Sequence, residues 1–239
     1  QNKNFLPKKN ILDKSSHIIC ISESTKKDLI DFYNIDPSKI SVTYLATNFK
    51  KENLNFINKK EIDYQYFLYV GSRWKYKNFK KLLEVFHYNS HILKNYKIIL
   101  FGGGNLDDNE INLIEKFNLD KKQIIQINGD EKTLKSLYAN AKFFIYPSKY
   151  EGFGLPILES FSQECPVLCS NTSSIPEVAG DAAIYFDPND TVSISNSIEK
   201  ILASDQIRQF YTNKGKERLN FFSWNKCAME TFKIYEKLN

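Results

Sequence analysis

Cysteines and long apolar runs are scarce in this sequence, and each scarcity excludes a class of protein. The 239 residues contain four cysteines, Cys20, Cys165, Cys169 and Cys227, in a spacing that fits no zinc site. A disulfide framework is not expected at this chain length, so we predict reduced core thiols. No apolar run approaches the ~18 residues that a membrane span needs, and no signal-peptide pattern opens the sequence. These observations favour a cytoplasmic protein.

Charge of either sign is also only weakly in excess. The sequence has 33 basic and 28 acidic residues, which gives a net charge of +5, and it contains no internal repeat or low-complexity tract. Such a small excess suits a nucleotide, a phosphate ligand or an anionic membrane surface. It does not demand nucleic acid, and we expect no nucleic-acid partner.

Short apolar runs alternate with helical patterns along most of the chain. Strands are predicted over Ser16–Ile21, Phe67–Gly71, Lys97–Phe101, Gln123–Ile127, Phe143–Tyr146, Val167–Ser170 and Ala183–Phe186. Helices are predicted over Ser24–Tyr33, Lys80–Leu93, Asp108–Phe117, Lys132–Ala139, Leu155–Ser162, Thr191–Leu202, Asp205–Leu219 and Trp224–Leu238. Strands and helices that alternate in this way imply a parallel sheet. The six strands between Tyr66 and Phe186 predict a doubly wound, Rossmann-like α/β domain.

The ends of the chain differ from this central domain. Before residue 48 the pattern offers little more than one strand, one helix and a short strand near Ile40–Tyr44, which cannot cover a sheet of their own. We therefore predict that residues 1–47 are the remnant of a preceding domain. The Asn- and Lys-rich residues 48–63 are predicted to be a linker, followed by a ligand-binding domain over 64–204 and closing helices over 205–239.

The stretch EGFGLPILE, residues 151–159, joins a strand to a helix and has the chemistry of an anion site. Gly152 and Gly154 let the backbone approach a ligand without a Cβ in the way. The free N–H groups of Phe153, Gly154 and Leu155 would face the carboxyl edge of the sheet, at the start of a helix that begins near Leu155. Such a helix start carries partial positive charge and binds phosphate.

Two glutamates, eight positions apart, flank this turn. Glu159 is one turn inside the helix, on the same face as Leu155, and could reach a sugar hydroxyl beside the phosphate. Glu151 lies in the loop, on the other side of the anion. Carboxylates suit sugar hydroxyls because they accept two hydrogen bonds at once. We interpret the pair as one carboxylate for each end of a nucleotide sugar; the alternative is a solvated loop residue and a surface helix residue.

The motif E-G-F-G-L-P-x-L-E resembles the E-x7-E motif of retaining glycosyltransferase family 4, the group 1 glycosyltransferases of the GT-B fold. Further stretches resemble that family in the expected order over most of the chain: SHIICISESTKKDL, YVGSRWKYKN, LYANAKFFIYPSKYEGFGLPILES, SSIPEVAGDAAIYFDP and FSWNKCAMETFKIYEKL. The resemblance implies the C-terminal, donor-binding half of a GT-B enzyme with a stub of the acceptor domain. It implies that Glu159 holds the ribose hydroxyls, that Glu151 contacts the transferred sugar, and that the glycine-turn amides face the diphosphate. Glu151 is catalytic only in a loose sense, since its action as a nucleophile is unsettled for the family.

A basic loop, VGSRWKYKN, follows the first strand of the central domain, where a doubly wound sheet places its ligands. A departing diphosphate needs its negative charge neutralised, and two cations can do so without a metal. By the resemblance, Arg73 and Lys77 have this role, with Lys75 as a stand-in for Lys77. Gly71, which opens the loop, joins the predicted substrate-binding set. A solvated basic turn is the alternative, and no metal or other cofactor is expected.

Two glycine-containing turns complete the predicted edge of the sheet. Gly102–Gly104 lacks the third glycine of a dinucleotide fingerprint and follows the second strand instead of the first, so a ligand-lining turn is favoured over NAD binding. Gly129, in the Asn-Gly-Asp that ends the third strand, is predicted to border the base.

Two groups of metal-binding residue types lack the partners that a metal site needs. Asp107 and Asp108 are interpreted as a helix start, because nothing near them in the sequence completes a site. His87 and His91 share one face of a predicted helix at i, i+4, yet no carboxylate or cysteine partner is evident. We expect no metal at either place.

Some positions depart from the family pattern. Glu164 stands where relatives usually end the helix with glycine, and a glutamate in the left-handed conformation costs on the order of 1 kcal/mol. Ser173 and Ser174 replace a glycine pair seen in many relatives, which leaves room for different packing around the sugar.

The predicted reaction moves a sugar from a nucleoside diphosphate sugar to a hydroxyl acceptor with retention of anomeric configuration. By family analogy the acceptor is a growing bacterial surface glycan or its lipid-linked precursor. The missing half would supply the acceptor pocket and any peripheral contact with the inner face of the cell membrane. Two alternatives stay open: a nucleotide-sugar epimerase or phosphorylase on the same scaffold, and a non-catalytic module that binds nucleotide sugars.

Overall fold

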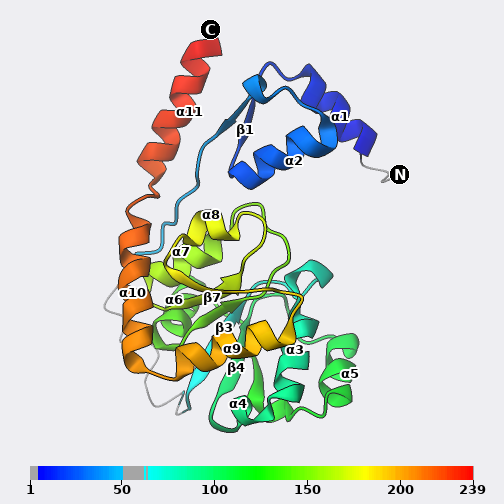
Figure 1. Cartoon of the computed structure of the whole chain (residues 1–239), viewed down its shortest axis with the longest axis vertical. Helices are drawn as coiled ribbons and strands as arrows, with labels where there is room; N and C mark the ends of the chain where they lie inside the picture. The colour runs from blue at the N-terminus through cyan, green and yellow to red at the C-terminus, as the bar shows by residue number, and fades with distance from the viewer. Residues whose placement is uncertain (1–4, 51–61, 63, 239) are drawn as a thin grey trace.

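Six parallel strands form the centre of the molecule (Figure 1). The computed structural model describes residues 5–50, 62 and 64–238. The strands are β3 (Tyr66–Val70), β4 (Lys97–Phe101), β5 (Ile124–Ile127), β6 (Phe144–Tyr146), β7 (Val167–Ser170) and β8 (Ala183–Phe186). Their order is β5-β4-β3-β6-β7-β8, and every neighbouring pair is parallel. The predicted doubly wound α/β sheet is confirmed.

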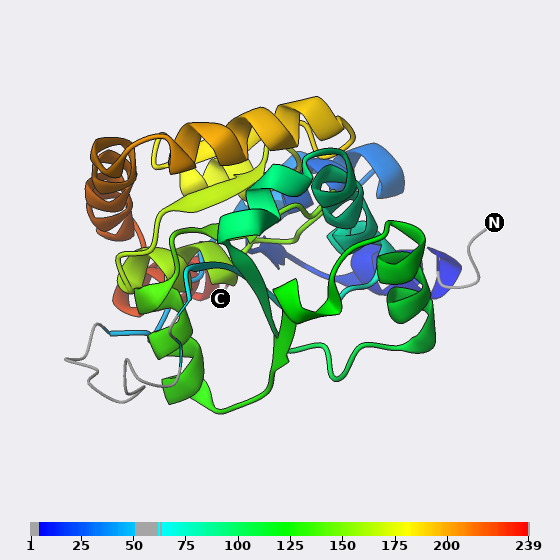
Figure 2. The same cartoon turned by 90° about the horizontal axis from the view of Figure 1, so that it is seen from below.

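Helices cover both faces of this sheet (Figure 2). One face carries α3 (Phe79–Tyr88), α4 (Ser90–Asn95), α5 (Asp108–Lys116) and α9 (Thr191–Leu202). The other face carries α6 (Glu131–Asn140), α7 (Leu155–Ser162) and α8 (Ile175–Ala179), and α10 (Asp205–Leu219) packs against both cores. Successive residues of β3 alternate between the two cores, as the pleat of a strand requires.

Strand β3 occupies the middle of the sheet because it can be buried on both faces. All five of its residues are buried, which is typical of an apolar strand in a covered parallel sheet. The Phe67 ring stacks on Phe143, with ring centroids 4.9 Å apart. The direction of winding reverses between β3 and β6. In a doubly wound sheet, the crevice at the carboxyl ends of two such strands is where a ligand binds.

A smaller unit precedes the sheet and lies at its carboxyl edge (Figure 1). It consists of α1 (Phe5–Lys14), β1 (Ile18–Cys20), α2 (Glu23–Tyr33), a 3-10 turn η1 (Pro37–Lys39) and β2 (Ile40–Val42). The strands β1 and β2 pair in parallel around a small core of Cys20, Ile35 and Ile40. This unit lies within residues 1–47, and its assignment as the remnant of a preceding domain stays a prediction. The boundary of the linker 48–63 stays a prediction, because residues 51–61 and 63 lie outside the described residues.

Several helices begin where the sequence places a capping residue. The helices α9, α10 and α11 (Trp224–Leu238) have the predicted bounds. The side chain of Asp190 accepts a hydrogen bond from the Val192 N–H, and Ser204 caps α10 in the same way. The helices α1 and α8 were not predicted.

The single helix predicted over Lys80–Leu93 is wrong, because the chain breaks into α3 and α4 at Asn89. The backbone N–H and the side-chain amide of Asn89 both donate to the carbonyl of Val85, at 2.9 and 3.0 Å. The first of these is an ordinary helical bond; the break lies in the Asn89 backbone, whose φ of −124° and ψ of 51° are not helical. His87 and His91 consequently have separate partners, the carbonyl of Phe117 and the carboxylate of Glu199.

The cysteines are free thiols, three of them buried in the cores and Cys227 partly exposed. Burial raises the pKa of the Cys165 thiol to about 12, which makes that thiol unreactive. Among the described residues, no helix is both long enough and apolar enough to cross a bilayer.

The carboxyl end of α7 forms a motif that normally contains glycine. The N–H of Glu164 donates to the carbonyl of Phe161, and the N–H of Cys165 donates to that of Ser160, both at 3.0 Å. This is the Schellman arrangement, whose residue after the cap is usually a left-handed glycine. Glu164 has a φ of 59°, so the turn keeps the left-handed conformation, although its cost for glutamate had suggested a local difference here. Its carboxylate pairs with Lys216 at 2.9 Å.

Replacement of Glu164 by glycine should raise the free energy of unfolding by about 0.5–1 kcal/mol, because removal of the Cβ strain outweighs one exposed ion pair. For a chain of this size we expect an increase in melting temperature of about 1–3 °C, measured by calorimetry. Glu164→Ala keeps the strain and loses the ion pair, so it should lower the melting temperature. Equal shifts for the two variants would contradict this account.

Candidate functional site

The start of α7 lies directly after the motif loop and leaves its backbone amides open. Helix α7 begins at Leu155, and Gly154 at the N-cap has a φ of 106°. Within the described part of the chain, no side chain caps this end. A Cβ on Gly154 would also approach the Ile157 side chain at 3.3 Å, so the turn favours glycine for both conformation and space. A helix start without a side-chain cap can bind an anion, and the role of the Phe153, Gly154 and Leu155 amides stays a prediction.

Lys77 and Glu151 meet at this crevice from the two strands that flank it. Lys77 lies in a 3-10 turn after β3, η2 (Lys75–Lys77), and Glu151 lies in the loop after β6. The Lys77 Nζ is 2.7 Å from the Glu151 Oε1, and the two side chains are only 15% and 11% exposed. The same Nζ is 3.5 Å from the hydroxyl of Tyr146. The structure thus joins two predicted site residues in one nearly buried ion pair.

Tyr146 forms the floor of this ion pair. Its ring centroid is 5.4 Å from the Lys77 Nζ. Burial and the Glu151 carboxylate raise the pKa of Tyr146 far above that of an ordinary tyrosine, so its hydroxyl stays protonated and can donate. Sequence analysis did not select Tyr146, because a tyrosine inside an apolar strand has the pattern of a core residue.

Ser173 and Ser174, which depart from the family pattern, hold the loop that carries Glu151 through hydrogen bonds. The N–H of Glu151 donates to Ser173 Oγ at 2.9 Å. The hydroxyl of Ser174 donates to the carbonyls of Glu151 and Phe153, at 2.8 and 3.0 Å. Ser173 has a φ of 51°, which explains why glycine also suits this position. The two serines therefore fix the backbone on both sides of Gly152.

Glu159 lies one turn into α7 and is half-buried beside Tyr138. The Tyr138 hydroxyl is 3.2 Å from Glu159 Oε2 and donates to it. Burial raises the pKa of Glu159, and the hydrogen bond from Tyr138 opposes that rise. The rings of Tyr138 and Tyr146 both contact Phe144, at centroid distances of 5.4 Å. A continuous row of three aromatic rings therefore connects the Glu159 side of the α7 start to the Lys77–Glu151 side.

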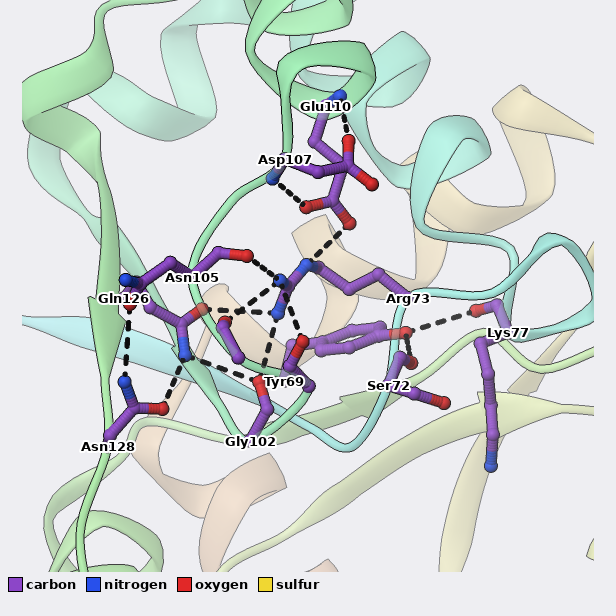
Figure 3. A network of polar contacts seen from close by, with 12 residues as sticks. Tyr69, Ser72, Arg73, Lys77, Gly102, Asn105, Asp107, Glu110, Gln126 and Asn128 are labelled. Carbon is purple, nitrogen blue, oxygen red and sulfur yellow. Dashed lines mark hydrogen bonds and ion pairs between the residues drawn. The ribbon is translucent and has the colours of Figure 1, made fainter.

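Arg73 was predicted to neutralise a diphosphate, but the structure pairs its guanidinium with Glu110 (Figure 3). Its Nε donates to Glu110 Oε1 at 2.6 Å, and the Arg73 side chain is 3% exposed. Its remaining donors bind backbone carbonyls of residues 102–105, at 2.9–3.4 Å, and the Gln126 Oε1 at 3.2 Å. The Lys77 Nζ points away from this network (Figure 3). The guanidinium is thus committed to protein partners, and a role for Arg73 in catalysis stays a prediction that requires it to leave Glu110.

The Arg73 network holds two glycine turns against each other. Gly71 and Gly102–Gly104 all have φ between 74° and 113°. A Cβ on Gly103 would come within 2.9 Å of both the Gly71 carbonyl oxygen and the Arg73 Nη1, so only glycine fits there. The triple glycine makes a close backbone contact with the turn after β3. Its predicted role as a ligand-lining turn stays a prediction. Glu110 and Gln126 were not predicted to take part.

Gly129, the remaining predicted residue, is exposed in the loop between β5 and α6. Its neighbour Asn128 donates to the Asn105 side chain at 3.4 Å, which connects this loop to the Arg73 network. The capping box of Asp107 and Glu110 confirms the predicted helix start. Among the described residues, no group of three His, Cys, Asp or Glu side chains is arranged to hold a metal ion.

The N-terminal unit contacts the motif loop directly. The Thr25 hydroxyl donates to the carbonyl of Gly152 at 3.3 Å. The carboxylate of Glu177, in α8, accepts from the N–H groups of Glu23 and Ser24 at 2.6 and 3.3 Å, and so caps α2 from the other unit. The crevice is therefore bounded by both units of the chain.

Fold and site together define a glycosyltransferase domain of the GT-B type. The chain belongs to the family described as glycosyl transferases group 1, whose model matches residues 50–218, more than half of the chain. This finding confirms the resemblance on which the site assignment was based.

Two curated relatives support the same family. The chain is 34% identical over 238 residues to an O-antigen chain mannosyltransferase B of Escherichia coli, covering 95% of this chain and 62% of the relative. It is 31% identical over 201 residues to the O-antigen chain mannosyltransferase RfbU of Salmonella typhimurium, covering 82% of this chain and 54% of the relative. The chain thus spans less than two thirds of the length of these relatives.

Solved structures share the fold. A sucrose-phosphate synthase from Thermosynechococcus elongatus matches with a TM-score of 0.84 at 20% identity, covering 100% of this chain and 62% of that one. A glycosyltransferase from Rickettsia africae matches with a TM-score of 0.79 at 19% identity, covering 99% and 67%. Anabaena HepE, solved in complex with UDP and glucose, matches with a TM-score of 0.81 at 13% identity, covering 98% and 66%. At these identities the likeness concerns the fold alone.

Proposed function

We propose that this chain is the donor-binding part of a retaining glycosyltransferase that uses a nucleoside diphosphate sugar. The observation that carries the proposal is the open start of α7 with the Lys77–Glu151 pair on one side and Glu159 on the other. Such a helix start suits a diphosphate, and the flanking carboxylates suit the hydroxyls of the two sugars. HepE, which has the same fold, was solved with UDP and glucose.

The reaction breaks the bond between the anomeric carbon and the diphosphate oxygen, and the electron pair leaves with the diphosphate. The acceptor oxygen forms the new bond and its proton is passed to the departing diphosphate. Lys77 and the α7 amides stabilise the growing negative charge, which is the largest contribution expected in such a site. Because these groups supply the positive charge, we propose that no metal takes part.

The acceptor in this proposal is a growing bacterial surface polysaccharide or its lipid-linked precursor. The names of both curated relatives indicate O-antigen chains as the product and mannose as the sugar. A lipid-linked acceptor would bring the protein to the inner face of the cell membrane. The sugar and the acceptor rest on these names, whereas the donor site rests on geometry.

The proposal is tested by titration with UDP-, GDP- and dTDP-sugars in a calorimeter, followed by transfer assays with the complete natural protein. We expect one nucleotide to bind well and its sugar to reach a hydroxyl acceptor with retained configuration. Epimerised donor without any acceptor would show an epimerase instead. Binding without turnover in the complete protein would show a non-catalytic module.

Replacement of Glu159 by glutamine should weaken binding of the preferred nucleotide by about tenfold, because a charged acceptor of two ribose hydrogen bonds is lost. The raised pKa of Glu159 adds a pH dependence to wild-type binding. Affinity should begin to fall, as the pH is lowered, at a higher pH than an ordinary glutamate would cause, since only the ionised carboxylate accepts both bonds. Glu115→Gln, an exposed charge removal on α5, is the control and should bind as the wild type does. An unchanged affinity in Glu159→Gln would remove Glu159 from the site.

A further inference from the structure

Trp74 is strongly exposed and lines a cavity whose lining includes neither Lys77 nor Glu151. Its side chain is 72% exposed, compared with 42% for Trp224, the other tryptophan of the chain. The cavity has a volume of 670 Å³ and lies between the loop after β3, the start of α3 and the start of α5. A large aromatic side chain left in water is a feature of interaction sites, since its burial would otherwise stabilise the fold.

The backbone on both sides of Trp74 is held rigidly. The Arg73 guanidinium is fixed by Glu110 and by the carbonyls of residues 102–105, as described above. The Tyr69 hydroxyl donates to the carbonyl of Ser72 at 2.9 Å. After Trp74, the Asn78 side chain donates to the carbonyl of Pro188 at 2.7 Å. The indole is therefore presented on an ordered turn, and a ligand that stacks on it does not have to order the loop.

The wall of the cavity has the polar groups that recognise a neutral polyhydroxyl ligand. Side chains with planar amide and carboxylate groups line it beside the indole, among them Asn105, Asp107, Asn109 and Glu110. Planar groups of this kind donate or accept two hydrogen bonds to neighbouring hydroxyls. Cations also line the wall, including Lys75 and Lys80. The lining has three cations, Arg73, Lys75 and Lys80, and two carboxylates, Asp107 and Glu110, and Arg73 pairs with Glu110, so neither sign dominates strongly. Asp107 and Glu110 also bond within the capping box, so a ligand hydroxyl would use their remaining lone pairs.

We propose that this cavity binds a saccharide of the acceptor chain, with the apolar face of one sugar ring stacked on Trp74 and its hydroxyls bonded to the asparagines and carboxylates. The identification of the saccharide as acceptor rests on the proposed function; the stacking site itself rests on the cavity. Arg73 and Glu110 line this cavity, and the Lys77 Nζ points away from them (Figure 3). The lining includes Arg73 and Lys75 but neither Lys77 nor Glu151, so the cavity lies beside the Lys77–Glu151 pair and on the same loop.

The sequence supplies a direct probe, because the chain has only two tryptophans. The experiment uses the complete natural protein with Trp224→Phe, and with any tryptophan outside these 239 residues also replaced by phenylalanine. Trp74 then supplies the tryptophan fluorescence. Titration with mannotetraose, and with maltotetraose as a second probe, should give a saturable change in its fluorescence at millimolar concentrations. The affinity should be the same at low and high salt, because the ligand is neutral. No saturable change with either probe up to about 20 mM, the weak limit of specific binding, would overturn the proposal.

Two variants test whether the indole makes the contact. Trp74→Ala should weaken tetrasaccharide binding at least tenfold by calorimetry, whereas Tyr88→Ala, which removes an exposed aromatic ring at the far end of α3, should change it less than twofold. Equal effects would overturn the proposal. The proposal would also be overturned if acrylamide did not quench the Trp74 fluorescence in the ligand-free protein. Another part of the polypeptide would then cover the indole.

The donor reaction is measured separately, so that the two proposals can fail independently. Hydrolysis of the nucleotide sugar by water, without acceptor, should be unchanged in Trp74→Ala, while the acceptor KM rises at least tenfold. Saccharide binding without nucleotide binding would leave the Trp74 site standing and remove the proposed function. Nucleotide binding and hydrolysis without saccharide binding would remove the Trp74 site and leave the proposed function standing.

Discussion

Replacement of Lys77 by methionine should lower the rate of sugar transfer by about 10²–10³-fold, the usual loss when one group that stabilises developing charge is removed. Methionine keeps a flexible apolar stem next to Tyr146 and removes only the ammonium group. Lys77 pairs with Glu151 in the loop that leads to α7, whereas the Arg73 guanidinium is engaged with Glu110. We expect the preferred nucleotide to bind more weakly as well, because its diphosphate loses the same partner.

Lys149→Met is the matched control for this variant. Lys149 is exposed in the loop after β6, and its N–H donates to the carbonyl of Tyr76, a bond that methionine retains. Steady-state transfer kinetics and nucleotide calorimetry should show a near-normal Lys149→Met and a strongly impaired Lys77→Met. Wild-type kinetics in Lys77→Met would show that the diphosphate is neutralised elsewhere, with Arg73 as the next candidate.

The fold could be predicted because the signals that define it are local. Each strand of the sheet is a short apolar run, and caps such as Asp190 and Ser204 mark where helices begin. The break at Asn89 was missed because apolar periodicity continues from α3 into α4, and only the non-helical backbone of Asn89 reveals the interruption. The helix α8 has only five residues, too few for a periodic pattern.

The candidate site was predictable only in part, for a related reason. Glu151, Gly154 and Glu159 lie within one strand–turn–helix segment, so that their spacing alone places them. The Arg73–Glu110 pair joins residues 37 positions apart, and the direction of the guanidinium depends on the packing of two glycine turns. Sequence spacing contains no information about that direction. The same holds for Ser173 and Ser174, whose hydroxyls reach back more than 20 positions to the motif loop.

Replacement of Glu151 by glutamine should separate binding from turnover, because Glu151 neutralises Lys77 in their ion pair. A diphosphate bound to the Lys77 ammonium competes with its 2.7 Å contact to Glu151 and brings further negative charge beside that carboxylate. A free nucleoside diphosphate compensates only the lysine and leaves the carboxylate without a partner in a nearly buried position. A nucleotide sugar compensates both groups, since its sugar hydroxyls can donate to Glu151. On the proposed function, we therefore expect the ion pair to favour the complete donor over the spent nucleotide.

In Glu151→Gln we accordingly expect the free nucleoside diphosphate to bind about tenfold more tightly, which corresponds to about 1.4 kcal/mol. Transfer should fall by about 10²–10³-fold, since the charged partner of the sugar at the reacting carbon is gone. Calorimetry with the diphosphate and transfer kinetics measure the two effects. In the double variant with Lys77→Met the gain in diphosphate affinity should disappear, because it depends on the released ammonium group. A tighter diphosphate complex in the double variant, or weaker binding in Glu151→Gln alone, would show that the pair does not govern access to Lys77.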